Sequence, residues 1–382
     1  MNIVVCCSGY PTKTDPVCPF VEQVVNAFSL MNISVTVVAP QSLVKHLIRG
    51  AELHPLYRTY QFGNGVPIRV YEPYALSFGN RYAKLNAWIR DYIVFRTLNK
   101  HKITADVYYG HFWHHAYSLY KYAKTKKKPL IVVTGESEIS LHKIHEPNKI
   151  KDFIDYVSGV ICVSTKNKEE SIRKQLLYDV DKSIVIPNAI DNSLFKVLDK
   201  EFLRKSFGIA KKDFVIAFTG WYDNNKGVKR LSEAIKSLNN QNIKSIFIGD
   251  IRDNSNSYPD CDGILHKGRL PHDKIPEYLN MADVFVLPTL HEGCNNAIIE
   301  AMACGLPVIS SNLPFNLDIL NDSNSILIDP MNVEEIANAI NTLYGDERLR
   351  LKLSEGALKT ASELTISNRA NKILNFIKSK IK

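Results

Sequence analysis

Residues 291–309 read HEGCNNAIIEAMACGLPVI and follow the apolar run 284–287, VFVL. The apolar run predicts a buried strand, residues 296–304 have the composition and apolar spacing of a helix, Gly305 is a helix stop, and residues 307–309 return to a strand. Glu292 then lies just before the helix, and Glu300 lies within it. The free N–H groups that open a helix suit a phosphate, and carboxylates accept hydrogen bonds from sugar hydroxyls. The stretch therefore predicts a sugar-nucleotide site, although Glu300 taken alone favours an ordinary solvated helix residue.

The length and composition predict a globular protein of two or three domains. The chain has 382 residues, of which 23% are charged and 45% hydrophobic, so neither disorder nor a membrane bundle is indicated. Its seven cysteines have no Cys-x-x-Cys spacing and are expected to be reduced core thiols. Met1 leads directly into a short apolar strand without a basic segment, and no run of about 18 apolar residues follows. We expect a cytoplasmic protein.

Strand-like and helix-like segments alternate along the chain, which predicts an α/β fold with parallel sheets. Strands are expected at residues 3–7, 35–38, 106–109, 130–134 and 160–163, and a new series at 214–218, 245–249, 284–287 and 307–309. We expect a boundary near residue 190, with an N-terminal domain at 1–190 and a C-terminal domain at 191–364. Residues 365–382 carry apolar positions at helical spacing with basic residues between them, which predicts a terminal amphipathic helix.

The motif at 292–309 resembles the signature of glycosyltransferase family 4, in which two glutamates separated by seven residues precede such a helix and strand. That resemblance implies the GT-B architecture, with two Rossmann-like parallel-sheet domains facing each other across a cleft and a last helix that crosses back to the first domain. It extends to three further segments: 10–23, similar to the opening loop and first helix; 187–191, PNAID, similar to an interdomain segment; and 218–227, FTGWYDNNKG, similar to a diphosphate-binding segment.

The resemblance also implies roles for single residues on the donor side. Glu292 would contact the hydroxyls of the donor sugar, Glu300 the ribose, and Lys226 the diphosphate. The main-chain N–H groups that would join Lys226 belong to Gly293, Cys294, Asn295 and Asn296.

Two further positions of the donor side leave alternatives open. Gly268 matches the family's nucleotide-base loop, with an ordinary turn glycine as the equal alternative. Trp221 stands where the family has a phosphate-binding Arg, so Arg230 or Arg269 is expected to supply the missing cation.

Three residues of the first half are candidates for the acceptor side: His111, Glu136 and Glu138. They follow predicted strands, and ligands bind at the carboxyl ends of strands in open α/β sheets. Each is equally well explained as a solvated loop residue, and the His that many family members carry near Glu136 is missing. Gly9 has no Gly-x-Gly-x-x-Gly context, so hydride transfer is not expected.

The net charge of +9 indicates an anionic partner. Basic residues are dense between Arg81 and Lys102, where the one acid is Asp91 and aromatic residues are interleaved, and again between residues 121 and 128. Such a helix is typical of a protein that lies on an anionic membrane surface, but a solvated helix whose aromatics face the core is an equal alternative. No nucleic-acid recognition motif accompanies the charge.

We therefore expect a retaining glycosyltransferase that moves a sugar from a UDP- or GDP-sugar to a hydroxyl of a glycan or lipid-linked acceptor, in surface polysaccharide or glycoconjugate synthesis. No cofactor and no metal are expected, because the chain has no Asp-x-Asp motif in a suitable loop and no His/Cys cluster. Two alternatives stay open: a sugar-nucleotide epimerase of the same fold, and a non-catalytic sugar-nucleotide or glycan-binding protein. The protein is expected in the cytoplasm, where the basic stretch would give peripheral binding to the inner face of the membrane.

Overall fold

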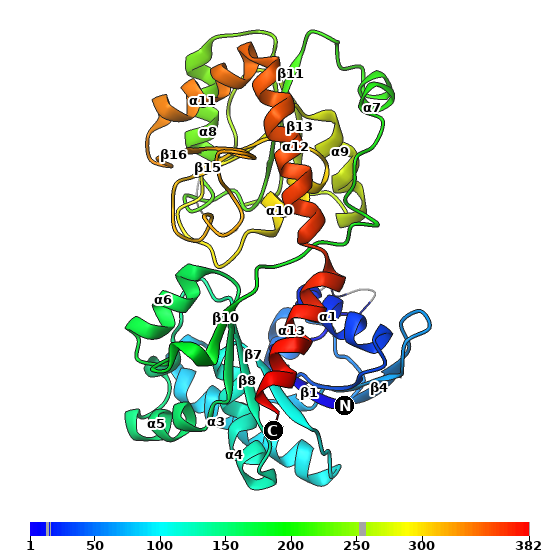
Figure 1. The fold of residues 1–382 in the computed structure, drawn as a ribbon, viewed down its shortest axis with the longest axis vertical. Helices are drawn as coiled ribbons and strands as arrows, with labels where there is room; N and C mark the ends of the chain where they lie inside the picture. Colours follow the sequence, from blue (N-terminus) through cyan, green and yellow to red (C-terminus); the bar gives the residue numbers. More distant parts are fainter. Residues whose placement is uncertain (13–14, 16, 252–256, 382) are drawn as a thin grey trace. The chain divides into compact units, whose positions relative to one another are not determined.

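The computed structural model describes residues 1–12, 15, 17–251 and 257–381 (Figure 1). These residues form two compact units. Unit 1 contains Met1–Ile186 together with the C-terminal segment from Ile366, and unit 2 contains Pro187–Thr365. Each unit is an open α/β sheet with its own core.

Unit 1 is built on an eight-stranded sheet with the order β10-β9-β8-β7-β1-β2-β5-β4. Every adjacent pair is parallel except β4 and β5. The strands are β1 (Asn2–Cys6), β2 (Ser34–Val38), β4 (Tyr57–Tyr60), β5 (Ile68–Tyr71), β7 (Val107–His111), β8 (Leu130–Thr134), β9 (Gly159–Cys162) and β10 (Ser183–Val185), and the short β3 (Gln41–Ser42) and β6 (Tyr74–Ala75) form a separate pair. The central strands β7 and β8 are buried along their whole length, because helices cover both faces of a parallel sheet.

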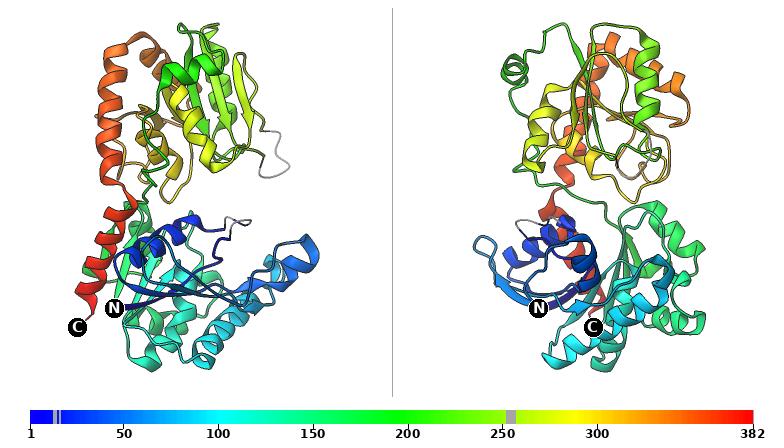
Figure 2. Two further views of the ribbon diagram at one scale, coloured as in Figure 1. Left: turned by 90° about the vertical axis from the view of Figure 1, so that its right-hand side faces the viewer. Right: turned by 180° about the vertical axis from the view of Figure 1, so that it is seen from behind.

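The helices of unit 1 form two layers. The α-helices are α1 (Pro19–Leu30), α2 (Leu43–Arg49), α3 (Ala83–Lys100), α4 (Trp113–Lys126), α5 (Pro147–Tyr156), α6 (Thr165–Arg173) and α13 (Ile366–Lys380), and the 3-10 turns are η1 (Asn80–Tyr82), η2 (Leu141–Lys143) and η3 (Val180–Lys182). α1 packs against α13, while α3 packs against α4 and α4 against α5 (Figures 1 and 2).

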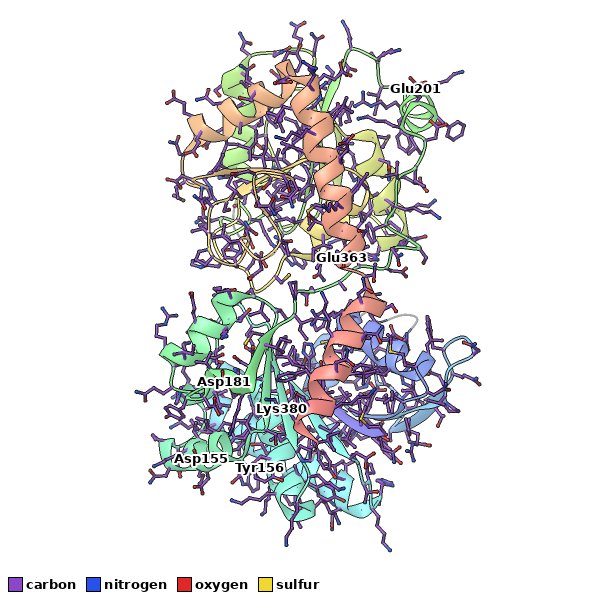
Figure 3. All side chains as sticks on the ribbon, viewed as in Figure 1. Asp155, Tyr156, Asp181, Glu201, Glu363 and Lys380 are labelled. Carbon is purple, nitrogen blue, oxygen red and sulfur yellow. The ribbon has the colours of Figure 1, made fainter. Side chains whose placement is uncertain are left out.

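The predicted C-terminal helix is α13, and it returns to unit 1 as expected. Its apolar stripe, with Ile373 and Ile377 at the centre, is buried. The helix lies so close to β9 that a Cβ at Gly159 would approach the ring of Phe376 to 2.8 Å. Near its end, Lys380 donates a hydrogen bond to the main-chain oxygen of Asp181 over 3.2 Å (Figure 3). Arg369, one of the basic residues that the sequence pattern placed on the polar face, is buried.

Unit 2 is built on a six-stranded, entirely parallel sheet with the order β13-β12-β11-β14-β15-β16. The strands are β11 (Phe214–Thr219), β12 (Ile243–Ile248), β13 (Ile264–Gly268), β14 (Val284–Leu287), β15 (Val308–Ser311) and β16 (Ser325–Ile328). The helices are α7 (Lys200–Ser206), α8 (Val228–Leu238), α9 (Ile275–Met281), α10 (Asn296–Ala303), α11 (Val333–Gly345) and α12 (Glu347–Glu363), with the turn η4 (His272–Lys274).

The strand order of unit 2 reverses between β11 and β14. From β11 the chain proceeds outward through β12 and β13, and from β14 it proceeds the other way through β15 and β16. In open α/β sheets, ligands bind outside the carboxyl ends of the strands at this switch point. The loops that follow β11 and β14 therefore lie where a ligand is expected to bind in unit 2.

Several strands were not predicted, including β16 and the short pair β3 and β6. Residues 264–268 form strand β13, whereas the sequence suggested only a loop there, so Gly268 is the last residue of a strand. The hairpin β4–β5 was not predicted; β5 has the alternating burial of a strand with one exposed face. The prediction of core thiols holds for Cys6, Cys7, Cys162 and Cys304, which are buried, whereas Cys18, Cys261 and Cys294 are half-buried. None of the seven forms a disulfide.

Candidate functional site

The loops after β11 and β14 of unit 2 are held together by hydrogen bonds. The main-chain N–H of Leu290 donates to the oxygen of Asn225 over 2.8 Å, and the Asn225 side-chain amide donates to the oxygen of His291 over 3.1 Å. Gly227, at the start of α8, has a φ of 77°, and a Cβ there would lie 2.5 Å from the oxygen of Pro288. A glycine is therefore required for the close approach of the two loops.

This approach brings together the two residues that the sequence analysis placed at the centre of the site. Lys226 Nζ forms an ion pair with Glu292 Oε1, and Thr289 Oγ1 donates to the same oxygen over 3.4 Å. The two side chains are only 16% and 18% exposed, so their charges are largely removed from water. Because a charge in such a place needs a partner, the ammonium and the carboxylate compensate each other here. The same ammonium suits a phosphate, and the same carboxylate suits hydroxyls.

Glu292 is followed by the amino end of α10, whose position is fixed by its N-cap and by the segment after Pro187. The Asn295 side chain caps the helix by accepting from the N–H of Ala297 over 3.2 Å. Asn188 donates from its side chain to the oxygen of Cys294 over 3.3 Å and to Asn296 Oδ1 over 2.9 Å. The loop 293–296 is thus held by its own cap and by Asn188, and the open N–H groups of the helix begin next to Glu292.

Glu300, one turn before the end of α10, has a partner that sequence reasoning missed. His272 Nε2 lies 3.2 Å from Glu300 Oε1. The ring of His272 packs edge-on against Phe195, with centroids 5.2 Å apart. The hydrogen bond to Glu300 raises the pKa of His272 above its ordinary value of 6.5. The sequence shows a His four residues after Gly268, but it does not show that this His contacts Glu300. That contact forms because α10 lies beside η4 in the tertiary structure.

The pH dependence of this pair is a testable consequence. Because the pKa of His272 is raised in the folded protein, the stabilisation from the pair is complete below the unfolded value near 6.5 and is lost as the pH rises through the folded pKa. In an NMR titration of the imidazole signals, His272 should titrate at a higher pH in the wild type than in Glu300→Gln. Equal midpoints in the two proteins would show that Glu300 does not hold the proton on His272.

The cation beside Trp221 is Arg269. The Arg269 guanidinium lies over the Trp221 ring, 5.2 Å from its centroid, and its Nε is 3.0 Å from Asp250 Oδ2. Arg230 is instead buried, and its guanidinium donates to the main-chain oxygens of Asn224 and Pro288 over 3.0 and 2.9 Å. Arg230 therefore braces the two loops, whereas Arg269 carries a mostly exposed positive charge next to the position of the family's Arg.

The main-chain groups of Gly268 are already used within unit 2. Its N–H donates to the hydroxyl of Tyr222 over 3.1 Å, and its oxygen accepts from the N–H of Gly249 over 3.0 Å. The Tyr222 hydroxyl in turn donates to the oxygen of Phe247 over 2.7 Å. The oxygen of Gly268 also lies 3.2 Å from His266 Nε2, so both main-chain groups of Gly268 have neighbours within unit 2.

The three candidates in unit 1 differ in exposure, and His111 is the buried one. His111, the last residue of β7, packs against the rings of Phe20 and Phe112, with centroids 5.1 and 4.6 Å away. Burial, assisted by the charge of Arg369, lowers the pKa of His111 to about 3. Its imidazole is therefore neutral.

Glu136 is half-buried. It accepts hydrogen bonds from the N–H groups of Trp113 and Gly135, each over 3.0 Å, and from the Thr134 hydroxyl over 2.7 Å. It thereby links the end of β8 to the start of α4, and burial raises its pKa. Glu138 is exposed and pairs with Lys143 over 2.8 Å, and that hydrogen bond lowers the pKa of Glu138. Glu138 is thus the one of the three whose side chain is open to solvent.

The part of the chain that the structure describes contains no group of three or more His, Cys, Asp or Glu side chains arranged to hold a metal ion. None of the helices within the described ranges has both the length and the apolar character needed to cross a bilayer.

Comparison with known proteins identifies the chemistry class of this fold. Residues 199–360 match the family of glycosyl transferases group 1. Over 365 residues, which are 91% of this chain and 90% of the relative, the chain is 27% identical to a Bacillus subtilis protein named as the teichuronic acid biosynthesis glycosyltransferase TuaC. Over 226 residues, or 56% of this chain and 58% of the relative, it is 30% identical to the Escherichia coli UDP-Gal:alpha-D-GlcNAc-diphosphoundecaprenol alpha-1,3-galactosyltransferase.

Solved structures agree in fold. Sucrose-phosphate synthase from Thermosynechococcus elongatus has a TM-score of 0.76 at 14% identity, with 99% of this chain and 98% of that chain covered. Anabaena HepE in complex with UDP has a TM-score of 0.72 at 18% identity, with 99% of each chain covered. These comparisons confirm the predicted GT-B fold class. The chain is a glycosyltransferase, and its residues 199–360 match the family of glycosyl transferases group 1.

Proposed function

We propose that this glycosyltransferase moves a sugar from a nucleoside diphosphate donor to a hydroxyl acceptor, with retention at the anomeric carbon. The observation that carries the proposal is the Lys226–Glu292 ion pair at the switch point of unit 2. It offers a cation for phosphate and a carboxylate for sugar hydroxyls beside the amino end of α10. The Escherichia coli relative is named for a UDP-Gal donor, and Anabaena HepE binds UDP, which supports this donor class.

The donor groups would divide among the residues as follows. The diphosphate lies against Lys226 and the N–H groups of loop 293–296, and Arg269, stacked on Trp221, supplies a second positive charge. The hydroxyls of the sugar bond to Glu292. Glu300, held by His272, bonds to the ribose hydroxyls. The base lies near the end of β13, beside the main chain of Gly268.

The reaction then needs stabilisation of a leaving diphosphate. As the bond from C1 to the diphosphate oxygen breaks, Lys226 and the helix N–H groups receive the developing negative charge. The acceptor oxygen bonds to C1 from the same face, and its proton passes to the departing phosphate oxygen. This route needs no protein base, which is compatible with the buried, neutral state of His111.

The experiment that tests the proposal follows one labelled donor at a time by NMR. A retaining transferase should release nucleoside diphosphate and, with an acceptor, form a product whose anomeric configuration equals that of the donor. Slow hydrolysis of the donor is expected without acceptor. A change of stereochemistry within an intact donor would instead indicate an epimerase, and an inverted product would contradict the proposed mechanism.

We further propose that no divalent metal takes part, because Lys226 and the amino end of α10 already provide positive potential for the diphosphate. Turnover should therefore persist in an excess of EDTA at the rate seen with Mg²⁺ present. The check is a paired rate measurement on protein stripped of metal. Complete loss of turnover in EDTA with recovery on adding Mg²⁺ or Mn²⁺ would refute this part of the proposal.

The acceptor is proposed to be a glycan or a lipid-linked glycan, reached at an anionic membrane surface through α3. Leu85, Trp88 and Tyr92 recur at helical spacing on α3 and are exposed, although large apolar side chains at such spacing normally face a core. Arg81 and Lys84 are exposed beside them. Arg90 takes no part in this surface, because it binds Asp91 and Ser118 within the unit.

A further inference from the structure

A groove in unit 1 has a lining that the proposed transfer reaction does not use. It has a volume of about 660 Å³ and lies where α3, α4 and the start of α5 meet. One lysine comes from each of these helices: Lys84 from α3, Lys121 from α4 and Lys149 from α5. Three ammonium groups on three separate elements around one hollow indicate a polyoxygen anion as the ligand.

Aromatic rings form much of the remaining wall. On α3, Trp88 and Tyr92 are stacked, with centroids 5.9 Å apart and planes at 9°, and they are 65% and 51% exposed. On α4, the ring of Tyr117 stacks on His145 at 3.8 Å, and Tyr120 packs on Phe153 at 5.7 Å. Exposed rings of this kind offer a surface to an apolar chain whose polar end stays wet.

The acids in the groove are already paired. Asp91 accepts from Arg90 over 3.0 Å and from the Ser118 hydroxyl over 2.5 Å. Glu146 pairs with Lys149 over 2.9 Å, but both side chains are largely exposed, and such pairs exchange partners at little cost. Sugar hydroxyls can bond to ammonium groups as well as to carboxylates, but a neutral glycan gains nothing from the excess positive charge that remains once Asp91 and Glu146 are paired, whereas an anion does. The lining therefore favours an anion over a glycan.

The net charge of the whole chain lies in the segment that contains α3 and α4, two of the helices that line this groove. Residues 81–128 contain eleven basic and two acidic side chains, a net charge of +9, which equals the net charge of the entire sequence. The rest of the chain is neutral on balance. An anionic surface would thus attract the face formed by α3 and α4, on which the groove opens next to the exposed Trp88.

We propose that this groove, named here the α3–α5 groove, binds one anionic phospholipid, with the phosphate between Lys84 and Lys149, which both neighbour Glu146, and the first methylene groups against Trp88 and Tyr92. Lys121, whose ammonium lies over the ring of Phe95, would meet the rest of the polar head group. The proposal rests on the membrane-surface part of the proposed function and adds a saturable site to a general electrostatic attraction. The site lies on the helical layer of unit 1, so lipid would hold the enzyme on the surface without occupying the donor site of unit 2.

The test uses dihexanoyl phosphatidylglycerol as a monomer, below its critical micelle concentration, and the full-length Trp221→Phe protein. Trp113 is fully buried, so Trp88 is the exposed tryptophan that remains to report on the groove. A saturable blue shift of its emission is expected with phosphatidylglycerol, a weak one with zwitterionic dihexanoyl phosphatidylcholine, and none with glycerol phosphate at the same concentration. Trp88→Phe should abolish the signal.

Two triple variants separate the groove from the general charge. Lys84→Gln/Lys121→Gln/Lys149→Gln should weaken binding about a hundredfold, at roughly a factor of five to ten for each ammonium removed. Lys126→Gln/Lys127→Gln/Lys128→Gln removes the same charge from exposed positions of the same basic region, outside the groove. The affinity of this variant for phosphatidylglycerol should stay within about twofold of the wild-type affinity.

Equal weakening by the two triples, or a shift that never saturates, would overturn the proposal. A saturable shift produced by a neutral oligosaccharide would also overturn it and would identify a glycan site. Donor hydrolysis should be unchanged in both triples. If the wild type hydrolyses no donor while lipid binding behaves as expected, the proposed reaction fails and the groove assignment stands.

Discussion

Glu292→Ala and Lys226→Ala should each lower kcat/KM by about ten- to a hundredfold or more. Loss of a charged hydrogen bond in a largely buried site costs about 1.5–3 kcal/mol, and each 1.4 kcal/mol corresponds to tenfold in rate. Either alanine variant also leaves the charge of the remaining partner unpaired. The series therefore includes Glu292→Gln, which removes the negative charge but keeps the shape of the side chain and two hydrogen-bonding groups. The measurement is steady-state transfer together with a denaturant titration that verifies the fold.

The chain offers a matched control for this experiment. Lys236, also on α8, pairs with Asp260 over 2.6 Å, but both side chains are substantially exposed. Lys236→Ala removes an ion pair of the same type outside the switch point and should leave kcat/KM within about twofold, because exposed pairs contribute little. Near-normal turnover by Glu292→Ala, or an equal loss in Lys236→Ala, would remove the central role from the Lys226–Glu292 pair.

Charge reversal on α3 should produce the other large effect. Arg81→Glu/Lys84→Glu/Arg96→Glu is expected to reduce binding to anionic vesicles by about a hundredfold or more, since each basic residue near such a surface contributes about 1 kcal/mol. Arg96 replaces Arg90 in this design because Arg96 is exposed, whereas Arg90 is tied to Asp91 and Ser118. The measurement is sedimentation with anionic and neutral vesicles at low and high salt.

The control for the vesicle experiment makes the same change in charge in unit 2. Lys205→Glu/Lys211→Glu/Lys212→Glu alters three exposed residues and should leave most of the binding. Wild-type protein should bind anionic vesicles alone, and salt should release it. If the wild type stays in the supernatant with anionic lipid at low salt, α3 is an ordinary solvated helix and the acceptor is better sought among soluble glycans.

The strand–loop–helix–strand order at residues 284–311 could be predicted because local patterns determine it. The apolar run, the N-cap Asn295 and the stop at Gly305 all lie within a few residues of the elements they delimit. The parallel α/β class followed from the same alternation. The hairpin β4–β5 was missed because its strands are short and half exposed, so their apolar signal is weak.

The contacts between side chains within the site could not be predicted from the spacing of residues in the sequence. Lys226 and Glu292 are 66 residues apart in sequence and meet because the strand order reverses between β11 and β14. His272 meets Glu300 only because α10 lies beside η4. Arg230 and Arg269 were equal candidates by sequence, and packing separates them: Arg230 faces the core of the loops, whereas Arg269 reaches Trp221. The roles of these residues in binding a donor remain predictions.

The basic stretch at residues 81–102 left two interpretations open, a membrane-surface helix and a solvated helix whose aromatic residues face the core. Phe95 packs against the core, as an ordinary helix would require, while Trp88 and Tyr92 are exposed. Both groups recur at helical spacing, so the sequence does not say which stripe faces inward. Contact of α3 with α4 decides it.

We expect the switch point of unit 2, with Lys226 and Glu292, to hold a nucleoside diphosphate sugar. The most direct measurement is thermal unfolding of the wild type and Lys226→Ala in a panel of UDP-, GDP-, ADP- and dTDP-sugars, because a ligand that binds the native state raises Tm. We expect that at least one donor raises the Tm of the wild type and that the rise is lost in Lys226→Ala. No rise with any donor, or an equal rise in the two proteins, would contradict it.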